Sequence, residues 1–97
     1  MIRHIVFFSA KRQEDIEAIR ARLLALGTIP YLTHFEVTTN TKVDPFCDAV
    51  DLVVYAEFPD AEALAAYKAH PTYSATTQAV RPMREMRVSA DVVADLD

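Results

Sequence analysis

Glycine and cysteine are scarce in this chain of 97 residues, which holds one glycine, one cysteine and no tryptophan. A single glycine excludes a glycine-rich loop that could wrap the phosphates of a nucleotide. A lone cysteine, Cys47, cannot form a disulfide within the chain and cannot begin a zinc cluster with a second thiol. The sequence therefore predicts no cofactor, and we expect a reducing compartment, the cytoplasm.

Long apolar runs and an excess of positive charge are also missing. No stretch approaches the ~20 residues of a membrane-spanning helix, and the apolar segment near the start is too short for a signal peptide. Fourteen acidic residues against ten basic ones give a formal net charge of -4, the wrong sign for binding phosphates or an anionic bilayer. We therefore expect no nucleic acid and no membrane as a partner.

Apolar residues are plentiful, at 52% of the chain, with 25% charged residues. The length suits one small domain, and we expect a single domain over residues 1–97. A chain so short buries only roughly 60–68% of the surface that its unfolded form exposes. An apolar fraction this high therefore favours further burial against a second subunit.

Hydrophobic periodicity divides the chain into strands and helices. The expected strands cover residues 2–8, 32–39, 50–58 and 86–90, and the expected helices cover 13–26, 61–70 and 72–80. We expect Gly27 to close the first helix and Asp60 to cap the second. Residues 40–48 form the longest irregular connection, and 91–97 form an acidic tail.

The order strand, helix, strand, strand, helix, strand predicts an α+β fold of the ferredoxin-like βαββαβ type, with a four-stranded antiparallel sheet. Both helical regions would then cover one face of the sheet. The other face would expose Ile5, Phe7, Val53 and Tyr55, and an apolar patch of that kind marks an interface. A symmetric pairing of two such faces would bury it and would make a dimeric α/β barrel.

Several short segments, taken in order, make the chain resemble a known family. They are Met1-Ile2-Arg3-His4-Ile5-Val6, Phe35-Glu36-Val37, Tyr55-Ala56-Glu57-Phe58 with Asp60, Tyr67-Lys68-Ala69-His70-Pro71, Arg81-Pro82 and Arg87-Val88. Along nearly its whole length the chain resembles the Dabb family, the stress-responsive proteins with a dimeric α/β barrel. The resemblance implies a ferredoxin-like fold, a homodimer with facing sheets and, for most members, no established reaction.

The resemblance also points to candidate site residues. Among similar proteins are plant polyketide cyclases of the olivetolic acid cyclase type, which close a ring by aldol-type chemistry without a cofactor, in a cavity between sheet and helices. Their strand histidine falls on His4 and their helix tyrosine on Tyr67. Their main catalytic histidine ends a His-Pro-x-His motif, but here Tyr73 takes that place. A phenol with a pKa near 10 mostly donates protons at neutral pH, so this departure weighs against cyclase chemistry.

Each candidate also has a structural interpretation. The candidate catalytic residues are His4, Tyr67 and His70, and the candidate ligand contacts are Tyr67, Tyr73, Val6 and Phe8. His4 suits a buried histidine bonded to a neighbour, Tyr67 suits a core residue whose hydroxyl needs a partner, and His70 suits a helix C-terminus. The three histidines are not spaced as metal ligands usually are, so no metal is expected.

Two functions remain open from the sequence. The first is a stress-responsive dimer of unassigned activity that binds a small molecule in a cavity between sheet and helices. The second is a cofactor-free enzyme resembling the polyketide cyclases, in which Tyr67 holds the substrate and His4 or His70 takes the proton. A filled cavity would favour the first function, and a histidine nitrogen within hydrogen-bond reach of Tyr67 or Tyr73 in an open cavity would favour the second.

Overall fold

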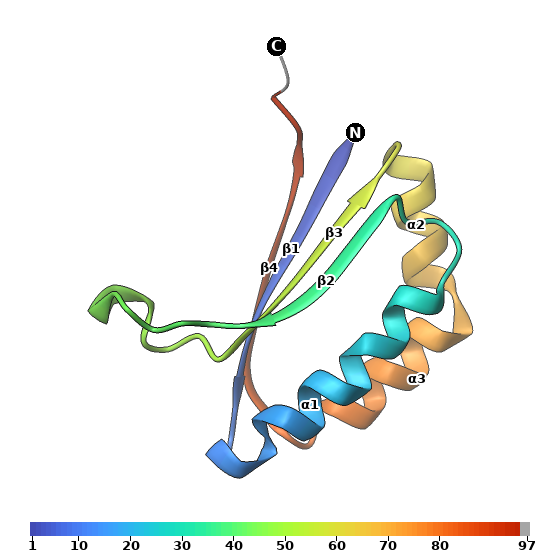
Figure 1. Ribbon diagram of the computed structural model, residues 1–97. Helices are drawn as coiled ribbons and strands as arrows, with labels where there is room; N and C mark the ends of the chain where they lie inside the picture. The colour runs from blue at the N-terminus through green and yellow to red at the C-terminus, as the bar shows by residue number, and fades with distance from the viewer. Residues whose placement is uncertain (96–97) are drawn as a thin grey trace.

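One four-stranded antiparallel sheet carries the three α-helices on a single face, as the computed structural model shows for residues 1–95 (Figure 1). The strands are β1 (Ile2–Ala10), β2 (His34–Thr39), β3 (Leu52–Phe58) and β4 (Arg84–Val93), and the α-helices are α1 (Ile16–Leu23), α2 (Ala61–Ala69) and α3 (Pro71–Val80). The strand order is β2-β3-β1-β4. The α+β, ferredoxin-like fold expected from the sequence is confirmed.

The two central strands explain where the core lies. In β1, His4, Val6 and Phe8 point toward the helices and are buried, whereas Phe7 points to the opposite face and is exposed. β3 alternates in the same way, and its Val54 lies directly opposite Val6. Because side chains alternate across a strand, this register gives the two central strands one buried face, which packs under the helices.

The first helical region is less regular than its periodicity predicts. Residues 13–15 and 24–28 are 3₁₀ helices at the two ends of α1, and the buried face of α1 carries Ile19 and Leu23. Gly27 does not close this region in the left-handed conformation, which corrects our expectation. Its role is steric, because a Cβ atom there would lie 2.7 Å from Cδ2 of Phe35.

Side-chain caps separate the two helices that follow β3. The Asp60 carboxylate accepts a hydrogen bond from the Ala63 backbone N–H at 2.8 Å, so the expected cap of α2 is present. α2 ends at Ala69, and Pro71 begins α3 at a position where its missing N–H costs nothing. The chain therefore turns sharply at His70, and α3 starts as a separate helix.

The last strand is longer than residues 86–90, which corrects the expected boundary and the first three residues of the expected acidic tail. β4 continues to Val93 because it pairs with β1 along nearly the whole of that strand. Asp91, expected in a tail, lies opposite His4 in this ladder. Residues 96 and 97 of the expected tail lie outside the described residues.

The face of the sheet away from the helices stays uncovered in the single chain. Phe7 is 39% exposed there, and its cross-strand neighbour Val88 is 53% exposed. Ile5 and Val53 are half-buried on the same face. We call this surface, made by Ile5, Phe7, Val53, Tyr55 and Val88, the open face. No helix within residues 1–95 is long and apolar enough to cross a membrane.

Candidate functional site

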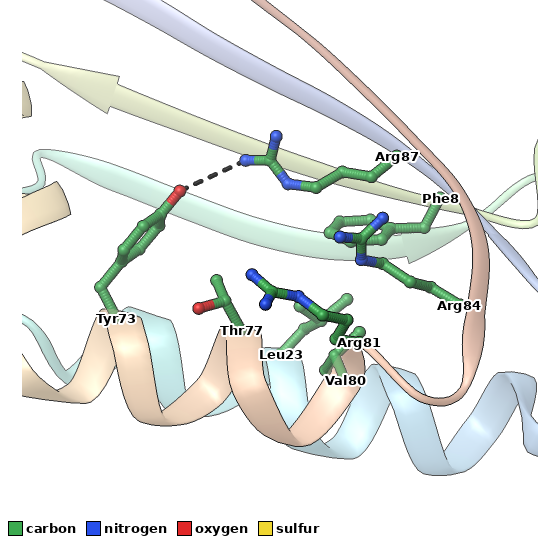
Figure 2. Close-up of a pocket in the computed structure, with 8 residues that line it drawn as sticks. All are labelled: Phe8, Leu23, Tyr73, Thr77, Val80, Arg81, Arg84 and Arg87. Atoms are coloured by element: carbon green, nitrogen blue, oxygen red, sulfur yellow. Dashed lines mark hydrogen bonds between the residues drawn. The ribbon is translucent and has the colours of Figure 1, made fainter.

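A cavity of about 240 Å³ lies between β4 and α3, on the helix side of the sheet (Figure 2). It opens to solvent and is lined by Phe8, Leu23, Tyr73, Thr77, Val80, Arg81, Arg84 and Arg87. We call it the outer cavity. Its walls come from β1, α1, α3 and β4, so the packing of the whole domain determines its shape.

A second, much smaller space of about 10 Å³ adjoins the outer cavity and extends beneath the helices. The two share Phe8, Leu23, Tyr73, Thr77 and Arg87. This inner cavity is also lined by His4, Val6, Leu26, Val54 and Tyr67. Its volume suits about one water molecule or one polar group of a ligand that occupies the outer cavity.

His4 is 1% exposed, and its ring is held by a carboxylate on the neighbouring strand. Nδ1–H of His4 donates to Asp91, whose other oxygen accepts from Nζ of Lys68 at 3.0 Å. Burial lowers the pKa of His4, although the hydrogen bond to Asp91 and its charge act in the opposite direction. A neutral ring that donates from Nδ1 carries its free lone pair on Nε2, and no hydrogen bond joins Nε2 to any part of residues 1–95.

Tyr67 lies beside His4 and is fully buried. The two ring centroids are 5.9 Å apart in an edge-to-face arrangement, and the Tyr67 and Tyr73 centroids are 5.2 Å apart. The Tyr67 hydroxyl has no hydrogen-bond partner among the residues that the structure describes. Burial raises the pKa of Tyr67, and the nearby Tyr73 adds to this, whereas Arg87 acts against it. The hydroxyl therefore stays protonated at neutral pH and is able to donate to a ligand.

Three arginines at the outer cavity were not predicted from the sequence. Arg81 comes from the end of α3, and Arg84 and Arg87 come from β4 (Figure 2). Arg87 donates a hydrogen bond to the hydroxyl of Tyr73 at 3.3 Å. Their signal in the sequence is weak, because the alternation of β4 shows which residues share a face but not which face turns toward the helices.

His70 is the one candidate that the structure places away from both cavities. Its Nδ1 accepts a hydrogen bond from the Thr72 backbone N–H at 3.1 Å and so caps α3, and its ring packs edge-on near Tyr31. His70 is therefore the C-cap of α2, the helix C-terminus expected from the sequence, and at the same time the N-cap of α3.

The other candidates come together at one place. His4, Val6 and Tyr67 line the inner cavity, and Phe8 and Tyr73 line both cavities. The same region holds a histidine with a free Nε2 lone pair, a protonated phenol and three guanidinium groups. Such a set can take a proton, donate a hydrogen bond and bind an anion. No group of three metal-ligating side chains is clustered for a metal ion within residues 1–95.

Comparison with known proteins identifies a family for this chain. The model of the stress responsive A/B barrel domain, Dabb, matches residues 2–94. A solved Dabb protein with a ferredoxin-like fold from Mesorhizobium loti is 27% identical, with a TM-score of 0.75 over 96% of this chain and 95% of that chain. None of the curated proteins matches the chain in sequence.

Two further solved structures share the fold at lower identity. A dimeric ferredoxin-like protein of unknown function from Thermobifida fusca is 24% identical, with a TM-score of 0.81 over 96% of this chain and 90% of that chain. The hydroxynitrile lyase of Passiflora edulis is 20% identical, with a TM-score of 0.79 over 99% of this chain and 95% of that chain. At these identities the likeness shows the fold and leaves the activity open.

Proposed function

This chain belongs to the Dabb family of stress-responsive A/B barrel domains, and from that membership we propose that it is a homodimer that binds a small molecule between its sheet and its helices. Residues 1–97 then form one domain. The proposed location is the cytoplasm, which suits a chain whose single cysteine has no partner within it.

The observation that carries this proposal is the Tyr67 hydroxyl. It is buried and unpaired within residues 1–95, at the inner end of a cavity that opens to solvent. A buried hydroxyl without a hydrogen-bond partner lowers the free energy of unfolding by about 1–3 kcal/mol. A ligand atom that accepts a hydrogen bond from it removes this penalty, which favours binding. A ligand in the outer cavity is able to supply that atom through the inner one.

Pairing of two chains through the open face is the second part of the proposal. The support is the apolar character of that face, where Phe7 and Val88 are exposed. Solved relatives from Bacteroides fragilis and Thermobifida fusca are described as dimeric. Facing sheets would remove these side chains from water and would leave both outer cavities on the outside of the dimer.

The binding function is tested by native mass spectrometry of freshly purified protein. We expect a dimer of two 10.9 kDa chains that retains a small molecule, which is released when the protein is denatured. As a variant, Tyr67→Phe should retain less of it, whereas Tyr31→Phe, at a tyrosine that lines neither cavity, should behave like the wild type. Bare chains in every preparation would contradict the proposal.

A cofactor-free enzyme is the second candidate function, and the His4–Asp91 pair is the observation that favours it. The Tyr73 substitution removes the imidazole expected in a cyclase, but Asp91 orients His4 so that Nε2 is free to act as a base. Aldol-type ring closure of a polyketide-like substrate would require that base. Turnover that falls about 10²- to 10⁴-fold in His4→Gln would support it, and turnover unaffected by this change would contradict it.

A further inference from the structure

The arginines of the outer cavity gather around one space and have no acidic partner within residues 1–95. Arg81, Arg84 and Arg87 form no ion pair with a carboxylate anywhere in residues 1–95. Ion pairs do form at some other arginines, since Arg12 and Arg20 both contact acidic neighbours. The chain has an excess of acids, with a formal net charge of -4, so partners are not scarce. Three unpaired guanidinium groups around one cavity therefore indicate an anion that comes from outside the chain.

The register of β4 contributes to this charge. The pairing of β1 with β4 shifts by one residue, so that Ala10 lies opposite Arg84 instead of Glu85. Ala10 follows the same alternation as Phe8, whose side chain points toward the helices. Without the shift, Glu85 would occupy this position, and its carboxylate would cancel one positive charge of the cavity. The irregular pairing thus places an arginine where a regular ladder would place an acid.

Apart from the arginines, the outer cavity has a largely apolar lining. Phe8, Leu23 and Val80 contribute apolar side chains, and Tyr73 and Thr77 of α3 add one hydroxyl each (Figure 2). A ligand that satisfies both parts has a charged end and an apolar body. An inorganic anion alone would leave the apolar wall in contact with water.

The volume limits the size of that body. A cavity of about 150 Å³ is enough for benzene, so about 240 Å³ accommodates one ring or a chain of about eight carbons with a headgroup. Drug-sized ligands usually occupy about 300–1,000 Å³. The outer cavity is therefore too small to enclose a nucleotide-sized molecule.

We propose that the outer cavity binds a small amphiphilic oxyanion, a carboxylate or phosphate attached to an apolar body of about one ring or eight carbons. This inference rests on the proposed function and adds the chemical class of the ligand. The headgroup lies among Arg81, Arg84 and Arg87, and the apolar body packs on Phe8 and Leu23. The Tyr67 hydroxyl donates to a polar atom of the ligand, or to a water that the ligand holds in the inner cavity.

Three probes that share one apolar chain test the headgroup: octanoate, octyl phosphate and 1-octanol. Their affinities are measured by isothermal titration calorimetry on the wild type, Arg84→Gln and Arg87→Gln. We expect at least one anion to bind about tenfold or more tightly than 1-octanol. Each arginine variant should weaken the binding of that anion by about ten- to a hundredfold, because a hydrogen bond to a charged group is lost. The binding of 1-octanol should not change in either variant.

The matched control is Arg22→Gln, which changes the net charge by the same amount at an exposed arginine of α1 outside both cavities. It should leave all affinities unchanged, and an equal loss in this variant would overturn the inference. If 1-octanol binds as tightly as both anions, the anionic class is wrong while the binding function stands. If none of the probes binds, the inference is also overturned. The proposed binding function is then judged separately, by whether a small molecule is retained in native mass spectrometry.

Discussion

His4 is a titratable side chain inside an apolar core, and Asp91 stabilises it there by accepting a hydrogen bond from its ring. The ring is 1% exposed, so leaving its N–H without an acceptor would cost about 1–3 kcal/mol. Asp91 supplies the acceptor from the neighbouring strand, and Lys68 holds the other carboxylate oxygen. The same three residues that stabilise the strand pair therefore orient the base of the candidate site.

Acid should destabilise the protein through His4. Burial lowers the pKa of His4 below 6.5, so the unfolded chain binds a proton there at pH values where the folded chain does not. The free energy of unfolding is therefore highest above pH 6.5 and falls as the pH decreases from 6.5 through the folded pKa. Urea unfolding measured between pH 8 and 5 should show this loss in the wild type.

Two histidine variants separate this effect from general acid sensitivity. His4→Asn keeps an N–H donor for Asp91 but does not titrate, so its stability should depend less on pH over this range. His34 is exposed, and the hydrogen bond from its ring to Glu36 raises its pKa. The His34→Asn variant should therefore still lose stability in acid through His4. An unchanged pH dependence in His4→Asn would contradict the assignment.

Asp91 should extend the loss to lower pH. Burial opposes ionisation of its carboxylate, but the hydrogen bonds from His4 and Lys68 outweigh this and lower its pKa below 3.8. The stability that Asp91 contributes is present above pH 3.8 and is lost as the pH falls through the folded pKa. The two groups thus act in the same direction in successive pH ranges.

At the scale of the elements, β4 explains why half of the site could not be predicted. Met86, Val88 and Ala90 alternate with Arg87, Ser89 and Asp91. Apolar residues usually turn toward the core, but here Val88 lies on the open face and Arg87 lies under the helices. Two conditions make this arrangement possible: the open face is itself apolar, and the helix side holds a cavity. Neither condition is visible in the local sequence.

Patterns within a short segment of sequence were enough to predict the helix caps and helix ends. The Asp60 cap and the ends of α2 and α3 follow from side chains close in sequence. The pairing of His4 with Asp91 depends on residues 87 positions apart, and the shift near Ala10 decides which residue faces the cavity. Such contacts need the register between strands, which periodicity within one strand does not contain.

The junction between α1 and β2 depends on a close contact between Gly27 and Phe35. A Cβ atom at Gly27 would lie 2.7 Å from Cδ2 of Phe35, so the phenyl ring must move. We expect Gly27→Ala to lower the free energy of unfolding by about 1–3 kcal/mol, the usual cost of overpacking. In a Phe35→Leu background the loss in urea unfolding should be smaller, because the side chain no longer carries the ring. Equal losses in both backgrounds would show that the contact is not the cause.

For the whole molecule, the order of the elements predicted the fold, and the apolar composition of one face is the basis for proposing a dimer. Ile5, Phe7, Val53 and Tyr55 were expected on the uncovered face, and the structure places them there together with Val88. The cavity could not be anticipated in the same way. Its walls come from four elements, and its size depends on side chains that meet only after packing.

Dimerisation is tested by placing a charge on the open face. Phe7→Asp would bury an unpaired carboxylate between the two sheets, which typically costs several kcal/mol, so we expect monomers in sedimentation at micromolar concentration. Leu24→Asp is the control, since Leu24 is 44% exposed, close to the 39% of Phe7, but lies on the helical side. The control and the wild type should remain dimers. A wild type that sediments only as a 10.9 kDa monomer would contradict the proposed pairing.

The outer cavity is the proposed binding site, so a side chain that fills it should prevent binding. Thr77 lines both cavities from α3, and Thr77→Phe would place a ring inside them, whereas Gln78→Phe adds the same ring at an exposed position of the same helix. The measurement is native mass spectrometry of each freshly purified variant beside the wild type. We predict a small molecule on the wild type and Gln78→Phe and bare chains for Thr77→Phe. Equal retention by all three proteins would place the binding site elsewhere.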